Sequence, residues 1–452
     1  MQIIAADQPL SKSMLWDIQR AYFLQAGMQA WQDDIVPHQI SCNPFMARAY
    51  AQVALGYLQD CVKNKRIDQS KPLYVVELGA GSGRLMVHFI HQLLPLLEIG
   101  QLADLNIKFV LTDFVPQIIE FWQSHPTLKP LVEKGLLDFA LFDVNDMRPL
   151  KLVHSGETLS AEVVQNPLIL LANYFFDSIP QDSFVIEEGE LAANLLTLYS
   201  SQPEPDLADS ALWDRLELAY EAMPTDDQPY PVELYNEILA DYEAQFSDTS
   251  ITFPNIGLDC IRFWTQFGNV LLLTADRGYA LAEALMGQDD PLPNLHGSFS
   301  MMVNYHAMSE YVERAGGVAF VAPHYQDNVQ TLAYVLHGSA DSNRQTQLAF
   351  EQAIVQNGPD DYFGLRRLLE SQIEQMTLSQ LLSLLRWSAY DGDLLRDCFG
   401  QLETLVQAEG EAWYEDVVEM LEKVKAQYLP IRPDDDLLAQ IDQLIASLFD
   451  TA

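Results

Sequence analysis

Short apolar runs alternate along the chain with longer segments whose apolar residues recur at helical spacing. Each short run is apolar almost throughout, which is typical of a strand buried on both faces, and a polar residue follows it. Five such strands are predicted, over residues 73–78, 107–111, 136–141, 168–172 and 270–274. Because helical segments separate them, the pattern predicts βα units, a doubly wound and mostly parallel sheet, and a ligand site at the carboxyl ends of the strands.

Two further strands are predicted to close this sheet. Residues 318–322 and 331–336 are largely apolar and flank the polar stretch 323–328, which is typical of an antiparallel hairpin. With this hairpin the predicted sheet has seven strands. The fold class is therefore α/β, with the sheet in a domain over residues 71–342.

The first seventy residues, 1–70, are predicted to be helical and to pack on that domain. Apolar residues recur at helical spacing over residues 14–31 and again over residues 44–63. The turn-rich stretch 36–44 between these helices either lies over a cofactor or only connects them.

An insertion over residues 184–255 interrupts the alternation before the last parallel strand. Between residues 185 and 250 it carries sixteen acidic residues and a single basic one, Arg215. Apolar residues within 212–220 and 232–246 predict helices with an apolar face. An insertion at this place is expected to form an acidic lid over the active-site cleft. Its charge either recruits a basic protein substrate or is simply a solvated face.

Beyond the polar linker 339–343 every predicted element is a helix. The helices are of similar length, over residues 361–375, 377–387, 391–408, 411–428 and 434–449. This all-α domain, residues 343–452, resembles a tetratricopeptide-type superhelix, although no regular repeat can be read in it. It is expected to bind a protein partner, or else to serve as a packing or dimerisation element.

Charge is the most unusual bulk property of the chain. Sixty-four Asp and Glu residues against 25 Lys and Arg residues give the 452-residue chain a net charge of −39. Such a surface repels phosphate backbones, which disfavours nucleic acid as the main partner and favours a basic protein or peptide. A surface adapted for solubility explains the same charge equally well. No apolar run reaches the ~20 residues of a membrane span, so no membrane partner is expected.

The four cysteines stand singly, and the sequence contains no Cys-x-x-Cys pair. This spacing predicts reduced thiols in a cytoplasm of bacterial type and no metal centre. The first ten residues lack a basic stretch followed by an apolar core, so no secretory signal is expected. The predicted location is therefore cytoplasmic.

The first predicted strand ends at Glu77 and runs into a turn with three closely spaced glycines, Gly79, Gly81 and Gly83. Glycine permits positive φ and lets a ligand approach the backbone, and the helix that follows offers free N–H groups. A dinucleotide site spaces its third glycine differently, which disfavours an NAD-dependent oxidoreductase. The turn resembles the nucleoside-binding loop of class I S-adenosylmethionine-dependent methyltransferases. Otherwise, the glycines only turn a strand into a helix.

That resemblance implies S-adenosylmethionine as the cofactor, bound by Glu77, the three glycines and two aspartates. Asp113 follows the second strand, where it is placed to accept hydrogen bonds from ribose hydroxyls. Asp143 follows the third strand, where it is placed near an adenine amino group. Each aspartate has an alternative role as an ordinary helix cap.

Polar residues after the fourth strand are the candidates for catalysis. In this fold the loop over residues 173–180 faces the methyl group, and it begins with Asn173. The phenol of Tyr174 or the carboxylate of Asp177 can orient a nucleophile by hydrogen bonding. Alternatively, Tyr174 and the two phenylalanines that follow it form an aromatic wall against the cofactor.

Three motifs together resemble the MidA-like methyltransferases, a family that includes the mitochondrial complex I assembly factor that methylates a protein arginine. They lie at residues 77–86, at residues 173–180 and at Asp276-Arg-Gly278, and the similarity spans roughly residues 40–340. The resemblance implies methyl transfer from S-adenosylmethionine, with a protein side chain as the favoured acceptor.

The chain departs from that family at several polar positions. Tyr174 stands where the family has Glu, and Ser298, Met302 and Asn304 stand where it has Asp, His and Asp. Fixed carboxylates hold a guanidinium best, so their loss leaves arginine as the acceptor, and turnover itself, open. The alternative function is a catalytically degenerate scaffold or assembly factor that binds its partner through the C-terminal helices.

Overall fold

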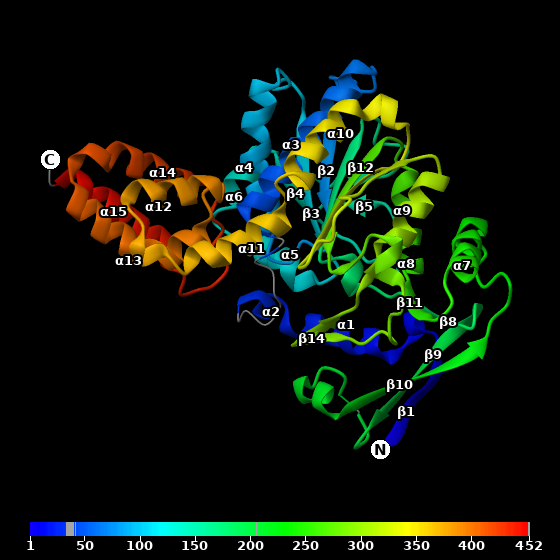
Figure 1. Ribbon diagram of the computed structural model, residues 1–452. Coiled ribbons are helices and arrows are strands. Elements are labelled where there is room, and N and C mark those ends of the chain that lie inside the picture. Colours follow the sequence, from blue (N-terminus) through cyan, green and yellow to red (C-terminus); the bar gives the residue numbers. More distant parts are fainter. Residues whose placement is uncertain (33–39, 41, 205, 451–452) are drawn as a thin grey trace.

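A sheet of seven strands forms the centre of the computed structural model, which describes residues 1–32, 40, 42–204 and 206–450 (Figure 1). The strand order is β17-β18-β12-β7-β2-β3-β4. The strands are β2 Leu73–Glu77, β3 Ile107–Asp113, β4 Leu137–Leu141, β7 Leu168–Asn173, β12 Val270–Asp276, β17 Val318–Phe320 and β18 Gln330–Val335. β18 is antiparallel to both neighbours, and the other pairings are parallel. The prediction of a mostly parallel α/β sheet is confirmed.

The order of the strands places three predicted site residues at one edge of the sheet. After β2 the chain adds β3 and β4 on one side, and it later returns to place β7 on the other side of β2. Such a reversal opens a crevice at the carboxyl ends of the strands, where ligands of α/β sheets bind. Glu77, Asp113 and Asn173 are the last residues of β2, β3 and β7, so all three lie beside this crevice.

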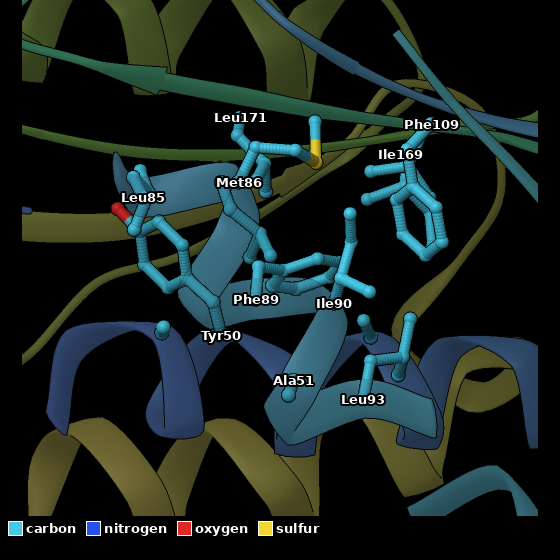
Figure 2. Close-up of a cluster of buried hydrophobic side chains, with 14 of the residues drawn as sticks. Tyr50, Ala51, Leu85, Met86, Phe89, Ile90, Leu93, Phe109, Ile169 and Leu171 are labelled. Atoms are coloured by element: carbon cyan, nitrogen blue, oxygen red, sulfur yellow. The ribbon is translucent and has the colours of Figure 1, made fainter. Parts of the chain in front are cut away.

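Helices cover both faces of the sheet, because side chains alternate between the faces along each strand. Val75 packs in one buried cluster with α3 and α4, whereas Val76 packs in another with α8 and α9. Figure 2 shows Met86 and Phe89 of α4 between Tyr50 of α3 and the strands. The helices of this unit are α3 Pro44–Lys63, α4 Arg84–Ile99, α5 Pro116–Ser124, α6 Lys129–Glu133, α8 Asn255–Thr265, α9 Tyr305–Arg314 and α10 Arg344–Phe350.

A second, antiparallel sheet joins the N-terminus to the acidic insertion. Its strands are β1 Gln2–Gln8, β8 Asp182–Glu187, β9 Glu190–Ser200, β10 Leu216–Pro224 and β11 Thr249–Phe253, and α7 Glu233–Gln245 precedes β11. Three two-stranded ribbons complete the strands: β5 Leu150–Lys151 with β6 Thr158–Leu159, β13 Gly278–Tyr279 with β16 Val303–Asn304, and β14 Asn294–His296 with β15 Ser298–Ser300.

Two helical predictions are wrong in this region. The first seventy residues are not entirely helical, because β1 pairs with β9 before α1 Met14–Ala26 and α2 Gln29–Gln32 begin. The segment 212–220 is not a helix beyond a short 3-10 turn that ends at Arg215, because β10 pairs with β9 along its whole length. The partner of β1 lies about 190 residues further along the chain, and the partner of β10 is the other half of its hairpin. In both cases the pairing with β9 decides the conformation. The predicted stretch 36–44 lies largely outside the described residues.

The C-terminal helices form a bundle that extends to one side of the parallel sheet (Figure 1). They are α11 Pro359–Glu370, α12 Leu378–Trp387, α13 Gly392–Glu409, α14 Tyr414–Gln427 and α15 Leu437–Asp450. A buried cluster of their own runs from Ile373 to Leu448, whereas Phe350 of α10 belongs to the core beside the parallel sheet. The predicted domain boundaries stay predictions. Over the described ranges, no helix has the length and apolar character needed to cross a bilayer.

Candidate functional site

The glycine turn between β2 and α4 is built around backbone conformations that favour glycine. Gly79, Gly81 and Gly83 have φ values of +61°, +52° and +78°. A Cβ on Gly81 would also lie 2.6 Å from the ring of Trp31, and one on Gly79 would lie 3.1 Å from the ring of Phe175. The first two glycines therefore allow both the turn and the close approach of aromatic rings, and the third is the N-cap of α4.

Hydrogen bonds hold this turn in place. The N–H of Gly81 donates to Asp113 Oδ2 at 3.1 Å, and its carbonyl accepts from the Trp122 indole at 3.1 Å. Within the described residues, the N–H groups of Gly79 and Ser82 make no hydrogen bond. Both residues line a cavity, so these two amides are the ones that a bound ligand can use.

Glu77 ends β2 directly below the turn and is only 3% exposed. Burial raises the pKa of this carboxyl well above its ordinary value, a backbone hydrogen bond from Met86 opposes that rise, and Asp113 adds to it. Its Oε2 atom is buried and has no hydrogen-bond partner among the described residues. Because an unpaired buried carboxylate is costly, this atom marks a place for a ligand with a hydrogen-bond donor or a positive charge.

A cavity of about 270 Å³ opens beside the turn. Six of the nine predicted site residues line it, namely Glu77, Gly79, Gly81, Asn173, Tyr174 and Asp177. An adjoining cavity of about 110 Å³ is lined by Asp113 and Asp143. Trp31, Gly79, Tyr174 and Ser178 line both cavities, so the two lie on either side of these residues. Gly83 lines neither, because it packs against Trp122.

Asp113 connects the glycine turn to the start of α5. Its Oδ1 accepts a hydrogen bond of 3.0 Å from the N–H of Val115, while Oδ2 accepts the bond from Gly81. Burial raises the pKa of this carboxyl to about 6, against the effect of these backbone bonds. Asp113 thus closes a short turn just before α5, whose N-cap is Val115, and does not cap the helix itself. It also lines the smaller cavity, where its contact with ribose stays a prediction.

Asp143 is held by a partner that the sequence did not suggest. Its carboxylate forms an ion pair with Arg20 of α1, and its Oδ1 accepts a hydrogen bond of 3.0 Å from the N–H of Asn145. The Arg20 guanidinium also lies 4.5 Å from the centre of the Phe114 ring. An adenine amino group would have to share or replace the Arg20 contact, so the predicted role of Asp143 stays a prediction.

The loop after β7 brings the three candidate catalytic residues to the larger cavity. Tyr50 donates a 2.6 Å hydrogen bond to Asn173 Oδ1, and Tyr174 adopts a φ of +51°. A non-glycine residue in this conformation is unusual and is often found at functional sites. Asp177 is 2% exposed and accepts a 2.8 Å hydrogen bond from Ser178.

Asp177 is one of two buried carboxyl groups at this edge of the sheet whose pKa is raised. Burial raises the pKa of its carboxyl to about 7, whereas the Ser178 bond and the charge of Arg277 lower it. Asp276 at the end of β12 adds a second buried carboxylate, which accepts a 2.7 Å hydrogen bond from Tyr305. The pKa of Asp276 is also raised, by burial first and then by the charge of Asp177. A carboxyl that titrates near neutral pH can accept a proton there.

The residues of segment 298–305 that line the cavity are not the ones that the family pattern implies. Asn304 caps α9, since its Oδ1 accepts a 2.9 Å hydrogen bond from the N–H of Ala307. Ser300 and His296 of the β14–β15 ribbon line the larger cavity instead, together with Arg277. His296 and Arg277 were not predicted as site residues from the sequence. Arg277 directly follows the end of a strand, where a polar residue is a usable signal. Trp31 carried no such signal.

Among the described residues no group of three His, Cys, Asp or Glu side chains has a metal-binding arrangement. No family model and no curated protein matches the chain. Among solved structures, an uncharacterized protein from Burkholderia thailandensis is 12% identical, with 74% of this chain and 89% of that chain covered and a TM-score of 0.41. A second Burkholderia thailandensis structure, bound to S-adenosyl-homocysteine, has the same identity and coverage and a TM-score of 0.44.

A magnesium protoporphyrin IX methyltransferase from Synechocystis, also with S-adenosyl-homocysteine, is 11% identical over 71% of this chain and 98% of that one, with a TM-score of 0.30. At these identities and TM-scores, the three structures assign no residue and no activity to this chain.

Proposed function

We propose that this chain is an S-adenosylmethionine-dependent methyltransferase whose acceptor is a protein side chain. The observation that carries the proposal is the meeting of the glycine turn, the unpaired carboxylate of Glu77 and the near-neutral carboxyl of Asp177 around one cavity. The MidA-like resemblance and a cytoplasmic location belong to the same proposal.

The residues present fit this cofactor. The buried, unpartnered Oε2 of Glu77 suits the cationic amino acid portion of the cofactor, and the amides of Gly79 and Ser82 suit its carboxylate. Asp113 and Asp143 line the smaller cavity, where their carboxylates can accept hydrogen bonds from a nucleoside. When bound, the cofactor supplies an activated methyl group on its sulfonium.

The chain's own residues then have to orient the acceptor and take up its proton. Asp177 can accept a proton from an acceptor group at neutral pH, because its pKa is about 7. Asn173 is held by Tyr50, so its amide presents a fixed hydrogen-bonding group to the cavity. Fixing both groups before the acceptor arrives lowers the barrier through positioning alone.

A second candidate function has one observation in its favour. In the structure the site residues bind one another: Trp31 lies against Gly81, and Arg20 occupies the carboxylate of Asp143. A degenerate site filled by its own side chains suits a scaffold or assembly factor. Its protein partner would then bind to the C-terminal helices, which carry an open groove beside Met376 and Trp387.

Calorimetric titration of the purified protein with S-adenosylhomocysteine and, separately, with NAD distinguishes these functions. Saturable binding of the first and none of the second is expected. The Glu77→Gln variant should bind much more weakly, whereas Asp146→Asn, which changes an exposed acid paired with Arg148, should bind as the wild type does. Incubation with methyl-labelled S-adenosylmethionine and lysate proteins should then label protein. Binding of neither compound would favour the scaffold.

A further inference from the structure

Residues 428–431, which begin the connection from α14 to α15 and are called here the bridge segment, lie between the C-terminal bundle and the parallel sheet. Tyr428 belongs to the buried cluster of the bundle, whereas Leu429 and Ile431 belong to the core on the α3–α4 face of the sheet. His125, which ends α5, contacts the carbonyl of Pro430 at 2.8 Å through its Nε2. The bridge segment is therefore part of both cores.

Arg84 ties the bridge segment to the glycine turn. It is the first residue of α4, directly after Gly83, and its side chain is only 8% exposed. Its Nε donates to the carbonyl of Leu429 at 3.0 Å, Nη1 to Asp393 Oδ2 at 3.1 Å, and Nη2 to the hydroxyl of Tyr428 at 3.4 Å. All three partners belong to the C-terminal part of the chain. A buried guanidinium is held firmly when its donors are matched in this way.

The same segment also holds the other side of the turn. Gln32, next to Trp31, donates a 2.7 Å hydrogen bond from Nε2 to the carbonyl of Ile431. The Trp31 ring lies against Gly81, at the boundary of the two cavities. The bridge segment thus contacts both the helix that follows the turn and the helix that carries the ring over it.

Packing fixes the bridge segment within the bundle. A Cβ on Gly392, at the start of α13, would overlap the Tyr428 ring, so glycine there allows the ring to pack closely against the helix. The Arg84 guanidinium also lies 5.4 Å from the centre of that ring. A shift of α13 or α14 would therefore move Tyr428 and, through it, Arg84.

We propose that the bridge segment positions the cofactor turn, so that the C-terminal helices set the affinity of the turn for a nucleoside cofactor. Arg84, Asp393 and Tyr428 are positioning residues, because none of the three lines either cavity. This inference rests on the proposed function. It also means that a partner bound to the C-terminal helices changes cofactor affinity without touching the cofactor.

The test compares Asp393→Asn, Asp393→Glu and Tyr428→Phe with the wild type by calorimetric titration with S-adenosylhomocysteine. Asp393→Asn should raise the Kd about tenfold, since it removes the charge-assisted bond to Arg84, and Asp393→Glu should restore most of the affinity. The matched control is Glu419→Gln, which breaks an exposed pair with Lys423 on the same bundle. It should leave the Kd unchanged.

Hydrogen exchange of the ligand-free protein provides a second readout that needs no bound cofactor. In Asp393→Asn and Tyr428→Phe the amides of residues 79–84 should exchange faster than in the wild type, at an unchanged melting temperature of the parallel-sheet core. If the wild type binds no S-adenosylhomocysteine, the proposed function fails, and the exchange rates alone decide the inference. Unchanged Kd and unchanged exchange in both variants would overturn it.

Discussion

Acidic side chains occur in two regions whose surroundings shift their pKa values in opposite directions. At the carboxyl edge of the parallel sheet Glu77, Asp113 and Asp177 are buried, and burial raises the pKa of each carboxyl, to about 6 for Asp113 and about 7 for Asp177. Beside the antiparallel sheet, hydrogen bonds from Arg215 lower the pKa of Glu204 to about 2. Burial makes a carboxyl responsive at neutral pH, whereas pairing makes it a permanent charge.

The chain carries 64 acidic residues, and this difference distinguishes the few that can take part in a reaction from the many that only contribute surface charge. The buried acids line two cavities beside the glycine turn, where a bound ligand can reach them. Most acids of the insertion point to solvent, as Glu217 and Glu221 do on β10. They contribute a negative field at the surface of the insertion.

The largest expected effect comes from a glycine substitution in the turn after β2, compared with one in the antiparallel sheet. Gly81→Ala puts a Cβ within 2.6 Å of the Trp31 ring at a φ of +52°, so S-adenosylhomocysteine binding should be lost and stability should fall by about 1–3 kcal/mol. Gly189→Ala, in the β8–β9 turn, has a φ of +82° but open space around it. It should cost about 1 kcal/mol and leave binding intact.

Thermal unfolding and calorimetric titration of both glycine variants check this pair. Equal losses of binding in the two would mean that backbone strain, and not the approach of Trp31 to the turn, explains the effect.

Asp177→Asn should lower the rate of methyl transfer about 100-fold while leaving cofactor affinity nearly unchanged. The reason is that the amide keeps the shape and the contact with Ser178 but accepts no proton. Steady-state kinetics give the measurement, with Glu204→Gln as the control from the other region. A fall in affinity with an unchanged turnover rate would assign Asp177 to binding instead.

The pH dependence of transfer should follow the same carboxyl. Transfer to a neutral acceptor should rise with pH through about 7, because Asp177 must be ionised to accept a proton. The folded protein holds this proton above the ordinary pKa of 3.8, so the group's contribution to stability is fully present below that pH and is lost as the pH rises through about 7. The free energy of unfolding of the wild type should therefore fall more between pH 4 and pH 8 than that of Asp177→Asn, as measured by thermal unfolding. An equal dependence of unfolding on pH in the two proteins would contradict the raised pKa of Asp177.

The smallest effect is expected in the antiparallel sheet. Changing both Glu217 and Glu221 to Gln should slow association with a basic peptide about twofold and weaken its salt dependence, without altering transfer from bound substrate. Stopped-flow association at two salt concentrations measures this. A large loss of transfer to bound substrate would show that the sheet has a more direct role.

The parallel sheet could be predicted from the sequence because its information is local. An apolar run such as residues 168–172 is buried wherever it pairs, and a polar residue at its end marks the ligand edge. The glycine turn was recognised for the same reason, since its φ values follow from the residues themselves. Residue contacts across the chain were not accessible in this way, and Trp31 over Gly81 is the clearest example.

The antiparallel sheet shows where local reasoning fails. In β10, half-buried Leu216, Leu218 and Tyr220 alternate with exposed residues, which is the period-two pattern of a strand. Leu216 and Tyr220 lie four residues apart, and this spacing also fits one face of a helix. In β1 the burial does not alternate regularly and the pairing with β9 contains two register shifts. Only the presence of β9, far away in the chain, makes that segment a strand.

Hydrogen exchange of the wild type with and without S-adenosylhomocysteine tests the central claim most directly, because it reports where a nucleoside binds. Protection should appear in residues 77–84 and 113–115, at the glycine turn and the start of α5, and should be absent from residues 182–253. Protection confined to the antiparallel sheet or the C-terminal helices, or none at saturating ligand, would contradict the assignment of the glycine turn as a cofactor site.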